Sequence, residues 1–302
     1  MTRLPRGTRD SGLGSRKNID AVGIVGLGLI GGSLAKAIAA GYPKTVLIGV
    51  EPSAKARRLA AKDGIFDRLL ARPLAELAQC QIVVLCAPVP AILRLLDPVS
   101  RRMREGALLT DVGGVKEPIV AAARKNVAPG VHFVGAHPMF GGEKGGYAAG
   151  RGELWKGGTV AVCTDSAAPE AIRESRRFYR SLGARVIPCT AAAHDRAVAA
   201  VSHLPYIVAS ALALTALEAG PLARLLAGQG LRDSTRLAEF AYEIQGQAAR
   251  GNANLVPSGH RFERHLRRLL AAVKADGPNV PPAFWRARAA SESLRKRRHS
   301  QD

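Results

Sequence analysis

The sequence predicts a two-domain protein, in which an α/β domain with a parallel sheet is followed by an all-α domain. A chain of 302 residues is long enough for two domains. From Ala21 to about Pro188, short runs rich in β-branched residues alternate with helical stretches. The runs stop after Pro188, and the rest of the chain reads as helices separated by glycine and proline. We expect four segments: a basic flexible tail at 1–19, the α/β domain at 20–189, the helical domain at 190–285 and a basic flexible tail at 286–302.

The strands expected in the first domain are short and almost wholly apolar, which is typical of strands covered on both faces. In chain order they are Ala21–Val25, Thr45–Val50, Ile82–Cys86, Ala107–Asp111, Val131–Gly135, Thr159–Cys163 and Arg185–Pro188. Helical stretches lie between them, among them Ser33–Ala40, Ser53–Lys62, Ala91–Met103, Glu117–Lys125 and Pro169–Leu182.

The turn after the first strand carries Gly26, Gly28 and Gly31 in the pattern G-x-G-x-x-G. A strand precedes the pattern, a helix follows it, and the acidic Glu51 comes at the end of the next strand. In that context the pattern indicates a dinucleotide site of the Rossmann type. Gly26 allows the tight turn, Gly28 lets the backbone approach a pyrophosphate, and Gly31 lets helix and strand pack closely.

Leu29 and Ile30 are the first residues of the following helix, and we expect its N-terminus to hold the pyrophosphate. Glu51 can accept hydrogen bonds from both ribose hydroxyls and repels a 2′-phosphate, which favours NAD. NADP is the alternative, because three cationic residues follow closely: Lys55, Arg57 and Arg58.

Two further loops follow predicted strands of the same sheet. Ala87 and Pro88 come after one strand, and Gly113 and Gly114 come after the next. Ligands bind at the carboxyl ends of such strands, and glycine permits close backbone approach. We expect these loops to line the nicotinamide end, although each also fits a plain strand-to-helix turn.

The net charge is +20, and much of the excess lies in the two tails. This distribution, with only 5% aromatic residues, argues against a nucleic-acid partner and for arginines that attract small anionic substrates. The cysteines form no C-x-x-C pair and have no histidine at metal-ligand spacing. We therefore expect a cytoplasmic location and no bound metal. We expect buried free thiols at all four cysteines, Cys80, Cys86, Cys163 and Cys189.

Two apolar segments resemble targeting signals. The first, at 21–40, follows a basic start but is interrupted by the glycines of the dinucleotide loop. The second, Ala197–Leu217, is 21 residues long and has no formal charge, which meets the length criterion for a membrane span. Because it contains His203 and Pro205, we expect a helix buried on all sides in a helical core and no membrane.

Histidine and arginine supply the candidate catalytic groups. His137 follows a predicted buried strand and precedes a glycine-rich, charged loop, as suits a general acid or base near neutral pH. His203 and Tyr206 lie in the apolar helix, where polar groups are costly to bury, and they fit equally a satisfied core pair. Arg236 can present a fork to a carboxylate, although such an arginine is commonly just solvated.

Five motifs appear together in the order of a known family: GLGLIGGS, DVGGVK, HPMFGGEKGG, SHLPY and RDSTRLA. Over residues 20–275 the chain resembles the prephenate dehydrogenase family, which includes arogenate and cyclohexadienyl dehydrogenases of tyrosine biosynthesis. The resemblance implies a Rossmann domain, a helical domain that dimerises, and an NAD-dependent oxidoreductase.

The resemblance also implies roles for single residues. His137 corresponds to a catalytic histidine that bonds the ring 4-hydroxyl, His203 to one that places the substrate, and Arg236 to a carboxylate anchor. Glu143 corresponds to a gating acid, and Lys144 follows it in the same motif. Two positions depart from the family pattern: Gly114 stands where serine is frequent, and Tyr206 where a second histidine is frequent.

The reaction implied is the oxidative decarboxylation of prephenate to 4-hydroxyphenylpyruvate, with His137 as base. The alternative substrates are arogenate and 4-amino-4-deoxyprephenate, because Gly114 and Tyr206 correspond to positions where the substrate should be read. A hypothesis from another class is a non-catalytic NAD-binding regulator whose basic tails bind nucleic acid. The presence of His137, His203 and Arg236 argues against that hypothesis.

Overall fold

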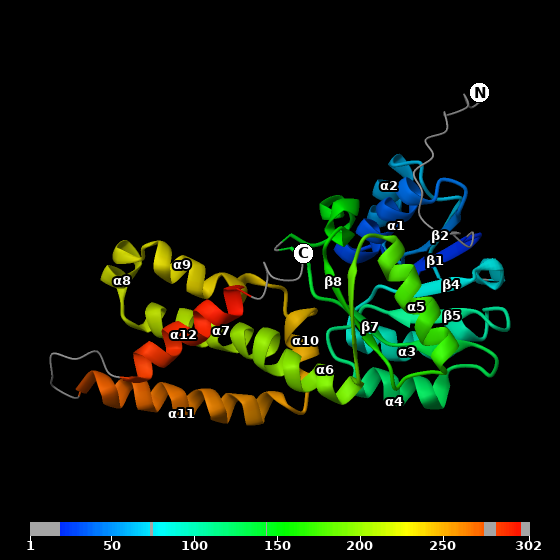
Figure 1. Ribbon diagram of the computed structural model, residues 1–302. Coiled ribbons are helices and arrows are strands. Elements are labelled where there is room, and N and C mark those ends of the chain that lie inside the picture. The colour runs from blue at the N-terminus through cyan, green and yellow to red at the C-terminus, as the bar shows by residue number, and fades with distance from the viewer. Residues whose placement is uncertain (1–18, 73–74, 143, 275–281, 297–302) are drawn as a thin grey trace. The chain divides into compact units, whose positions relative to one another are not determined.

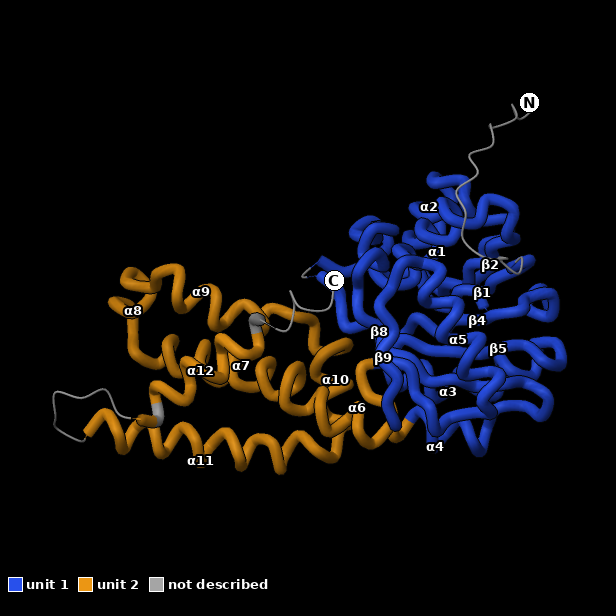
Figure 2. The backbone as a smooth tube through the Cα atoms, viewed as in Figure 1, with its two compact units in different colours: residues 1–113, 119–190 blue, residues 114–118, 191–302 orange. Residues whose placement is uncertain are grey.

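The computed structural model describes residues 19–72, 75–142, 144–274 and 282–296 (Figure 1). The chain forms two compact units (Figure 2). Unit 1 comprises residues 1–113 and 119–190, and unit 2 comprises residues 114–118 and 191–302. The five-residue segment 114–118, which lies within the first half of the chain, therefore belongs to the helical unit.

The main sheet of unit 1 has six parallel strands in the order β3-β2-β1-β4-β5-β6. This is the strand order of Rossmann dinucleotide-binding domains, so the predicted fold class is confirmed. The short strand β3 was not predicted. The strands are β1 (Ala21–Val25), β2 (Val46–Val50), β3 (Arg68–Leu70), β4 (Ile82–Leu85), β5 (Leu108–Asp111) and β6 (His132–Val134).

A second sheet of three strands follows, which the sequence pattern did not distinguish from the first. Strand β8 (Thr159–Cys163) pairs antiparallel with β7 (Ala136–Pro138) and parallel with β9 (Arg185–Cys189). The predicted strand Val131–Gly135 is thus shorter, and His137 lies within β7 rather than in the loop after a strand. The chain changes sheets at Gly135, where the space for a side chain is limited by Val120 and Cys163.

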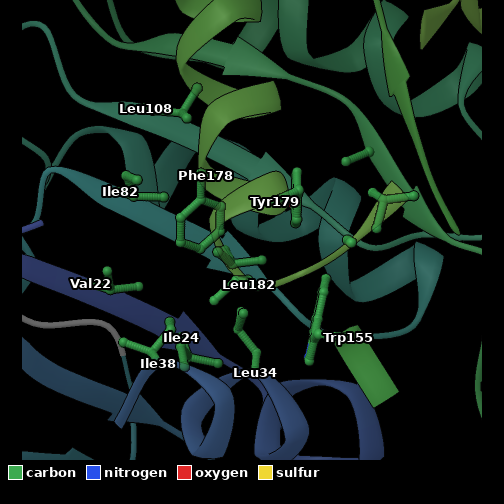
Figure 3. Packing of buried hydrophobic residues seen from close by; sticks show 14 of the residues in the cluster. Val22, Ile24, Leu34, Ile38, Ile82, Leu108, Trp155, Phe178, Tyr179 and Leu182 are labelled. Carbon is green, nitrogen blue, oxygen red and sulfur yellow. The ribbon is translucent and has the colours of Figure 1, made fainter. Parts of the chain in front are cut away.

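The helices of unit 1 are α1 (Leu29–Gly41), α2 (Ala54–Lys62), α3 (Val89–Ser100), α4 (Glu117–Asn126) and α5 (Pro169–Ser181). Alternate residues of the central strands face α1 and α5, as period-two alternation in a strand requires. Figure 3 shows the resulting core, in which Trp155 stacks on Tyr179 with ring centroids 5.8 Å apart. The labelled members of the core are Val22, Ile24, Leu34, Ile38, Ile82, Leu108, Trp155, Phe178, Tyr179 and Leu182.

Unit 2 is helical throughout its described residues, apart from the connecting turns. Its α-helices are α6 (Ala191–Val198), α7 (Leu204–Glu218), α8 (Pro221–Leu226), α9 (Gln229–Thr235), α10 (Gln245–Arg250), α11 (Leu255–Lys274) and α12 (Pro282–Lys296). The expectation of a flexible tail from residue 286 is wrong up to residue 296, because these residues belong to α12.

Helices α6 and α7 are joined by a π-helical turn, Ala199–His203, so that Ala191–Glu218 forms one long rod. The Leu204 amide donates to the Ala199 carbonyl, five residues back, and Pro205 follows with no amide hydrogen to continue the α pattern. Among the described residues, this is the only helix long and apolar enough to cross a membrane.

The expectation that this helix is buried on all sides is wrong for the single chain. Only 22% of its most apolar window is buried, and in α7 only Ala209 is. The error arose because an uncharged segment looks the same whether its own chain or another surface covers it. Large side chains that stay exposed along the rod include Val201, Ile207, Leu214 and Leu217.

Candidate active site

The carboxyl ends of the central strands meet at one edge of the main sheet. Val25 pairs with Val50 and Leu85, and Leu85 pairs with Asp111. The loops that follow these strands therefore start side by side, as expected for the ligand edge of an open parallel sheet. These loops carry the sequence-predicted cofactor residues of unit 1.

The glycine loop forms a tight turn between β1 and α1. Gly26 has φ +99°, and a Cβ there would lie 2.2 Å from the Cys86 carbonyl oxygen. A Cβ on Gly31 would lie 2.0 Å from the Gly26 carbonyl oxygen, whereas one on Gly28 would meet nothing within 4 Å. Of the three glycines of the motif, only Gly28 thus faces open space. The backbone amides in the first turn of α1, from Leu29 onward, can donate hydrogen bonds to an anion. This cradle fits a dinucleotide pyrophosphate.

Glu51 is fixed at the end of β2 by backbone hydrogen bonds to its carboxylate. The Leu27 amide donates to Oε2 at 2.9 Å, and the Ser53 amide donates to Oε1 at 2.8 Å. The Arg57 guanidinium instead donates to the carbonyl oxygens of Glu51 and Pro52. A carboxylate held in this place suits a ribose diol and repels a 2′-phosphate, which fits NAD better than NADP.

Ala87 and Pro88 follow β4 and lead directly into α3. A Cβ on Gly26 would lie 3.4 Å from the Ala87 amide nitrogen, so this turn and the glycine loop are immediate neighbours. Burial raises the pKa of the preceding Cys86 thiol, and the charge of Asp111 raises it further, so the thiol stays neutral. This cysteine therefore offers no thiolate for chemistry at the edge.

Asp111 joins the third loop to the strand that carries His137. Its Oδ2 accepts from the Gly113 amide at 2.8 Å, and its Oδ1 accepts from the Ala136 amide at 3.1 Å. The Asp111 side chain is fully buried, so each bond has little competition from water. One carboxylate therefore positions both a predicted cofactor residue and the backbone beside the half-buried His137.

The loop after β7 is anchored by Tyr147. The Tyr147 hydroxyl donates to Asp63 Oδ2 at 2.8 Å, and the Lys36 ammonium lies 3.3 Å from the same oxygen. A Cβ on Gly32 would lie only 2.9 Å from the Tyr147 ring, so the loop packs directly on α1. Lys144 is exposed in this loop, and the predicted Glu143 lies outside the described residues.

The other predicted site residues belong to unit 2. His203 ends the π-helical turn with 1% of its surface exposed, and its Nδ1 lies 3.2 Å from the Asn252 side-chain nitrogen. Burial lowers the pKa of His203, against the charge of Asp195, which raises it. Tyr206 is half-buried one turn further along α7. Arg236 is exposed at the start of a short 3-10 helix, Arg236–Glu239.

Sequence reasoning missed three residues that position the predicted ones. Asp111 belongs to the motif DVGGVK, and no sequence signal indicates that its carboxylate joins two loops. Asp195 lies eight residues before His203 on the same rod, and Asn252 contacts His203 from 49 residues further along the chain. An Asp beside a His at the start of an apolar helix was the only available signal, and Asn252 lies in an ordinary turn.

Comparisons with known proteins agree across nearly the whole chain. Residues 34–188 match the family model "Prephenate dehydrogenase, nucleotide-binding domain", and residues 190–280 match "Prephenate dehydrogenase, dimerization domain". The chain is 33% identical to a prephenate dehydrogenase of Lactococcus lactis, over 86% of this chain and 73% of that protein. A prephenate dehydrogenase of Bacillus subtilis is 31% identical, over 72% of this chain and 60% of that protein.

A cyclohexadienyl dehydrogenase of Zymomonas mobilis is 28% identical, over 91% of this chain and 96% of that protein. The solved structure of Aquifex aeolicus prephenate dehydrogenase, in complex with hydroxyphenyl propionate and NAD+, superposes with a TM-score of 0.80. That structure is 26% identical and covers 94% of this chain and 98% of its own. Together with the nucleotide-binding family model and the cradle described above, it supports NAD as the cofactor. The chain belongs to the prephenate dehydrogenase family and is an oxidoreductase.

Proposed function

We propose that this protein oxidatively decarboxylates prephenate to 4-hydroxyphenylpyruvate and CO2, with His137 as the general base. The C4–H bond breaks with its electron pair, the 4-hydroxyl loses its proton, and the C1–carboxylate bond breaks to release CO2. The electron pair of that bond enters the ring, which becomes aromatic, and the resulting phenolate takes back the proton. NAD+, held by the glycine loop and Glu51 when bound, would supply the hydride acceptor.

The observation that carries the proposal is the pair of Asp111 hydrogen bonds to Gly113 and Ala136. They fix the backbone beside His137 and the loop expected at the nicotinamide end from a single buried group. Aromatisation supplies the driving force, so the protein mainly has to align the reactants and provide one base. A histidine suits this work because its ordinary pKa lies near neutral pH.

Basic side chains are proposed to hold the two carboxylates of the substrate. Arg236 is exposed and its guanidinium can bond a carboxylate with two parallel hydrogen bonds, and Lys144 adds a second cation. Glu143, Gly114 and Tyr206 are proposed to contact the substrate around its ring and side chain. His203 is proposed to help place the substrate.

The test is NADH formation by the purified protein with NAD+ and prephenate, comparing wild type with His137→Asn. Loss of a general base lowers kcat by about 100- to 10,000-fold. His132→Asn is the matched control, because His132 is exposed at the start of the neighbouring strand β6. Full activity in His137→Asn would refute the base, and NAD binding without any NADH formation would refute prephenate as substrate.

The substrate alternatives are arogenate and 4-amino-4-deoxyprephenate. Gly114 has no side chain to offer a substrate group, and Tyr206 offers a phenol rather than an imidazole. Both features suit a changed substituent on the ring or side chain. The ratio of kcat/KM on the three compounds distinguishes these substrates, and Gly114→Ser with Tyr206→His should shift that ratio toward prephenate if these positions read the substrate.

We also propose that the protein works as a homodimer in the cytoplasm. The match to a dimerisation domain and the exposed apolar side chains along α7 support the dimer. The cysteines of the described residues are free, and Cys80 and Cys163 are buried, which suits a reducing compartment.

A further inference from the structure

Unit 2 buries a cluster of polar groups of which the proposed function uses only His203. His194, Asp195, His203 and Asn252 are each at most 4% exposed, and we call them the Asp195 cluster. They come from α6, from the end of the π-helical turn and from the turn after α10. Polar groups buried in an apolar unit are costly unless each finds a partner, so their arrangement is informative.

The Asp195 carboxylate holds the segment 114–118 by its backbone. Its Oδ1 accepts from the Lys116 amide at 2.7 Å, and its Oδ2 accepts from the Glu117 amide at 2.8 Å. His194 Nδ1 lies 2.6 Å from Oδ1. Backbone amides at the start of α4 are thus satisfied by a side chain from another helix.

Asn252 is oriented without ambiguity by two backbone partners. The Asn254 amide can only donate, and it contacts Oδ1 at 2.9 Å. The Asp195 carbonyl can only accept, and it contacts Nδ2 at 2.7 Å. The oxygen and nitrogen of an amide side chain are usually hard to tell apart, but here exchanging them would break both bonds.

The orientation of Asn252 decides the state of the His203 ring. Its Nδ2 lies 3.2 Å from His203 Nδ1, and since Nδ2 can only donate, Nδ1 must accept. An imidazole that accepts at Nδ1 is neutral and carries its proton on Nε2. That nitrogen remains as the ring's donor, and the Gly114 backbone, which raises the pKa of His203, is the acceptor we assign to it.

The charges around the ring are consistent with this state. Burial lowers the pKa of His203, which is the largest influence, and His194 lowers it further. The Asp195 charge and the Gly114 hydrogen bond raise the pKa, but they do not reverse the shift. A ring that is neutral in the folded protein matches the hydrogen-bond geometry.

We propose that Asn252 is a positioning residue, which holds His203 as the neutral tautomer protonated on Nε2 and so fixes the backbone at Gly114. The chain runs directly from Gly113 to Gly114, so this lock acts on the loop expected at the nicotinamide end. In that respect the inference rests on the proposed function, and it assigns His203 a role in holding the loop. Together with Asp195, Asn252 would keep Gly114, Lys116 and Glu117 of segment 114–118 in one conformation.

The direct test is NMR of the full-length protein labelled with ¹⁵N-histidine, with the His203 signals identified by their loss in His203→Gln. Long-range couplings from ring protons distinguish protonated from unprotonated ring nitrogens. We expect His203 to have an unprotonated Nδ1 and a protonated Nε2 at pH 7, and to stay neutral below pH 6.5, its ordinary pKa. A doubly protonated ring at pH 7, or a proton on Nδ1, would overturn the proposal.

Asn252→Asp tests the lock by replacing a donor with an acceptor of the same shape. We expect His203 to become protonated on Nδ1 and its pKa to rise. Each unit by which that pKa exceeds the assay pH lowers the neutral fraction about tenfold, and kcat/KM should recover as the pH is raised. Asn126→Asp is the matched control, because Asn126 is exposed and bonds only the Ala122 carbonyl of its own helix.

The two failures are distinguishable. The NMR result needs no substrate, so it stands or falls whether or not prephenate is oxidised. An unchanged His203 signal in a folded Asn252→Asp protein would refute the lock while leaving the proposed reaction intact. If that variant does not fold, the wild-type spectrum alone decides the tautomer.

Discussion

At the scale of single residues, the buried carboxylates do more than the histidines to define the site. Asp111 and Asp195 each accept two backbone amides, and each is at most 1% exposed. A carboxylate with two acceptor oxygens can join two chain segments that have no other reason to meet. The Gly113 and Ala136 backbone in unit 1, and the Lys116 and Glu117 backbone in unit 2, are therefore held by contacts that do not depend on long, mobile side chains.

Replacing Asp111 by asparagine should break one of its two bonds, because the amide nitrogen would face a backbone donor. The unpaired buried donor costs about 1–3 kcal/mol of unfolding free energy. We also expect a fall in kcat, since Gly113 and the backbone beside His137 lose their common anchor. Urea denaturation and steady-state kinetics measure the two effects, and a variant with wild-type stability would show that the bonds are dispensable.

The buried His203 should make stability depend on pH in a defined direction. Its pKa is lowered in the folded protein, so between that pKa and 6.5 the unfolded chain binds more protons. The free energy of unfolding therefore rises with pH through this window. The contribution of His203 is fully present above pH 6.5 and is lost as the pH falls below 6.5 toward the pKa of the folded protein. His203→Gln should flatten this part of the profile in urea denaturation, whereas the exposed His132→Gln should follow wild type.

At the scale of elements, α1 serves two neighbours at once. Its N-terminus forms the dinucleotide cradle, and its Gly32 lies under the Tyr147 ring of the loop after β7. Ser33 Oγ accepts from the Arg151 amide, and Lys36 donates to the Gly150 carbonyl. One face of a single helix thus anchors the loop that carries Lys144.

Two glycine-to-alanine changes within α1 should have opposite effects. Gly32→Ala places a methyl group 2.9 Å from the Tyr147 ring, so the ring must move and the protein should lose about 1–3 kcal/mol of stability. Gly41→Ala meets nothing within 4 Å and should gain stability, up to about 1 kcal/mol, from helix propensity. Thermal unfolding of both variants checks this, and equal effects would show that Tyr147 yields freely.

The sequence predicted the elements that depend on local pattern. Strand–helix alternation and the glycine motif gave the main sheet, the cradle and Glu51, because apolar strands and tight turns leave a local signature. The second sheet escaped prediction because β7 is three residues long and its pairing with β8 is non-local. Asn252 escaped for the same reason, since its partners lie at 195 and 203 and no spacing rule connects them.

At the scale of the whole molecule, the helical unit exposes more apolar surface than a solitary chain usually tolerates. Val201, Leu214 and Leu217 on the long rod are at least 50% exposed, and α11 adds Leu270 and Val273. Monomeric soluble proteins seldom expose contiguous apolar patches of this kind. The described part of unit 2 therefore has apolar side chains that its own chain leaves uncovered, which agrees with the proposed homodimer.

Leu214→Glu should weaken that dimer. In a two-fold interface the same residue is lost from both copies, and burying a leucine contributes about 1.5–3 kcal/mol. The pair amounts to about 3 kcal/mol or more, or about a 100-fold rise in the dissociation constant. Sedimentation equilibrium measures it, with Leu214→Met as the control that keeps an apolar side chain. A dimer of wild-type affinity in Leu214→Glu would exclude this part of α7 from the interface.

The π-helical turn Ala199–His203 takes up one extra residue within the long rod. A π turn holds one residue more than an α turn. In an α-helix each residue turns the direction of the side chain by about 100°. The wider turn absorbs that residue, so removing it would restore a continuous α-helix and leave α7 pointing in nearly the same direction relative to α6. A side-chain period of about 3.6 residues that is followed along the sequence from α6 therefore falls one residue out of step in α7, and this offset is a property of chain length rather than of composition.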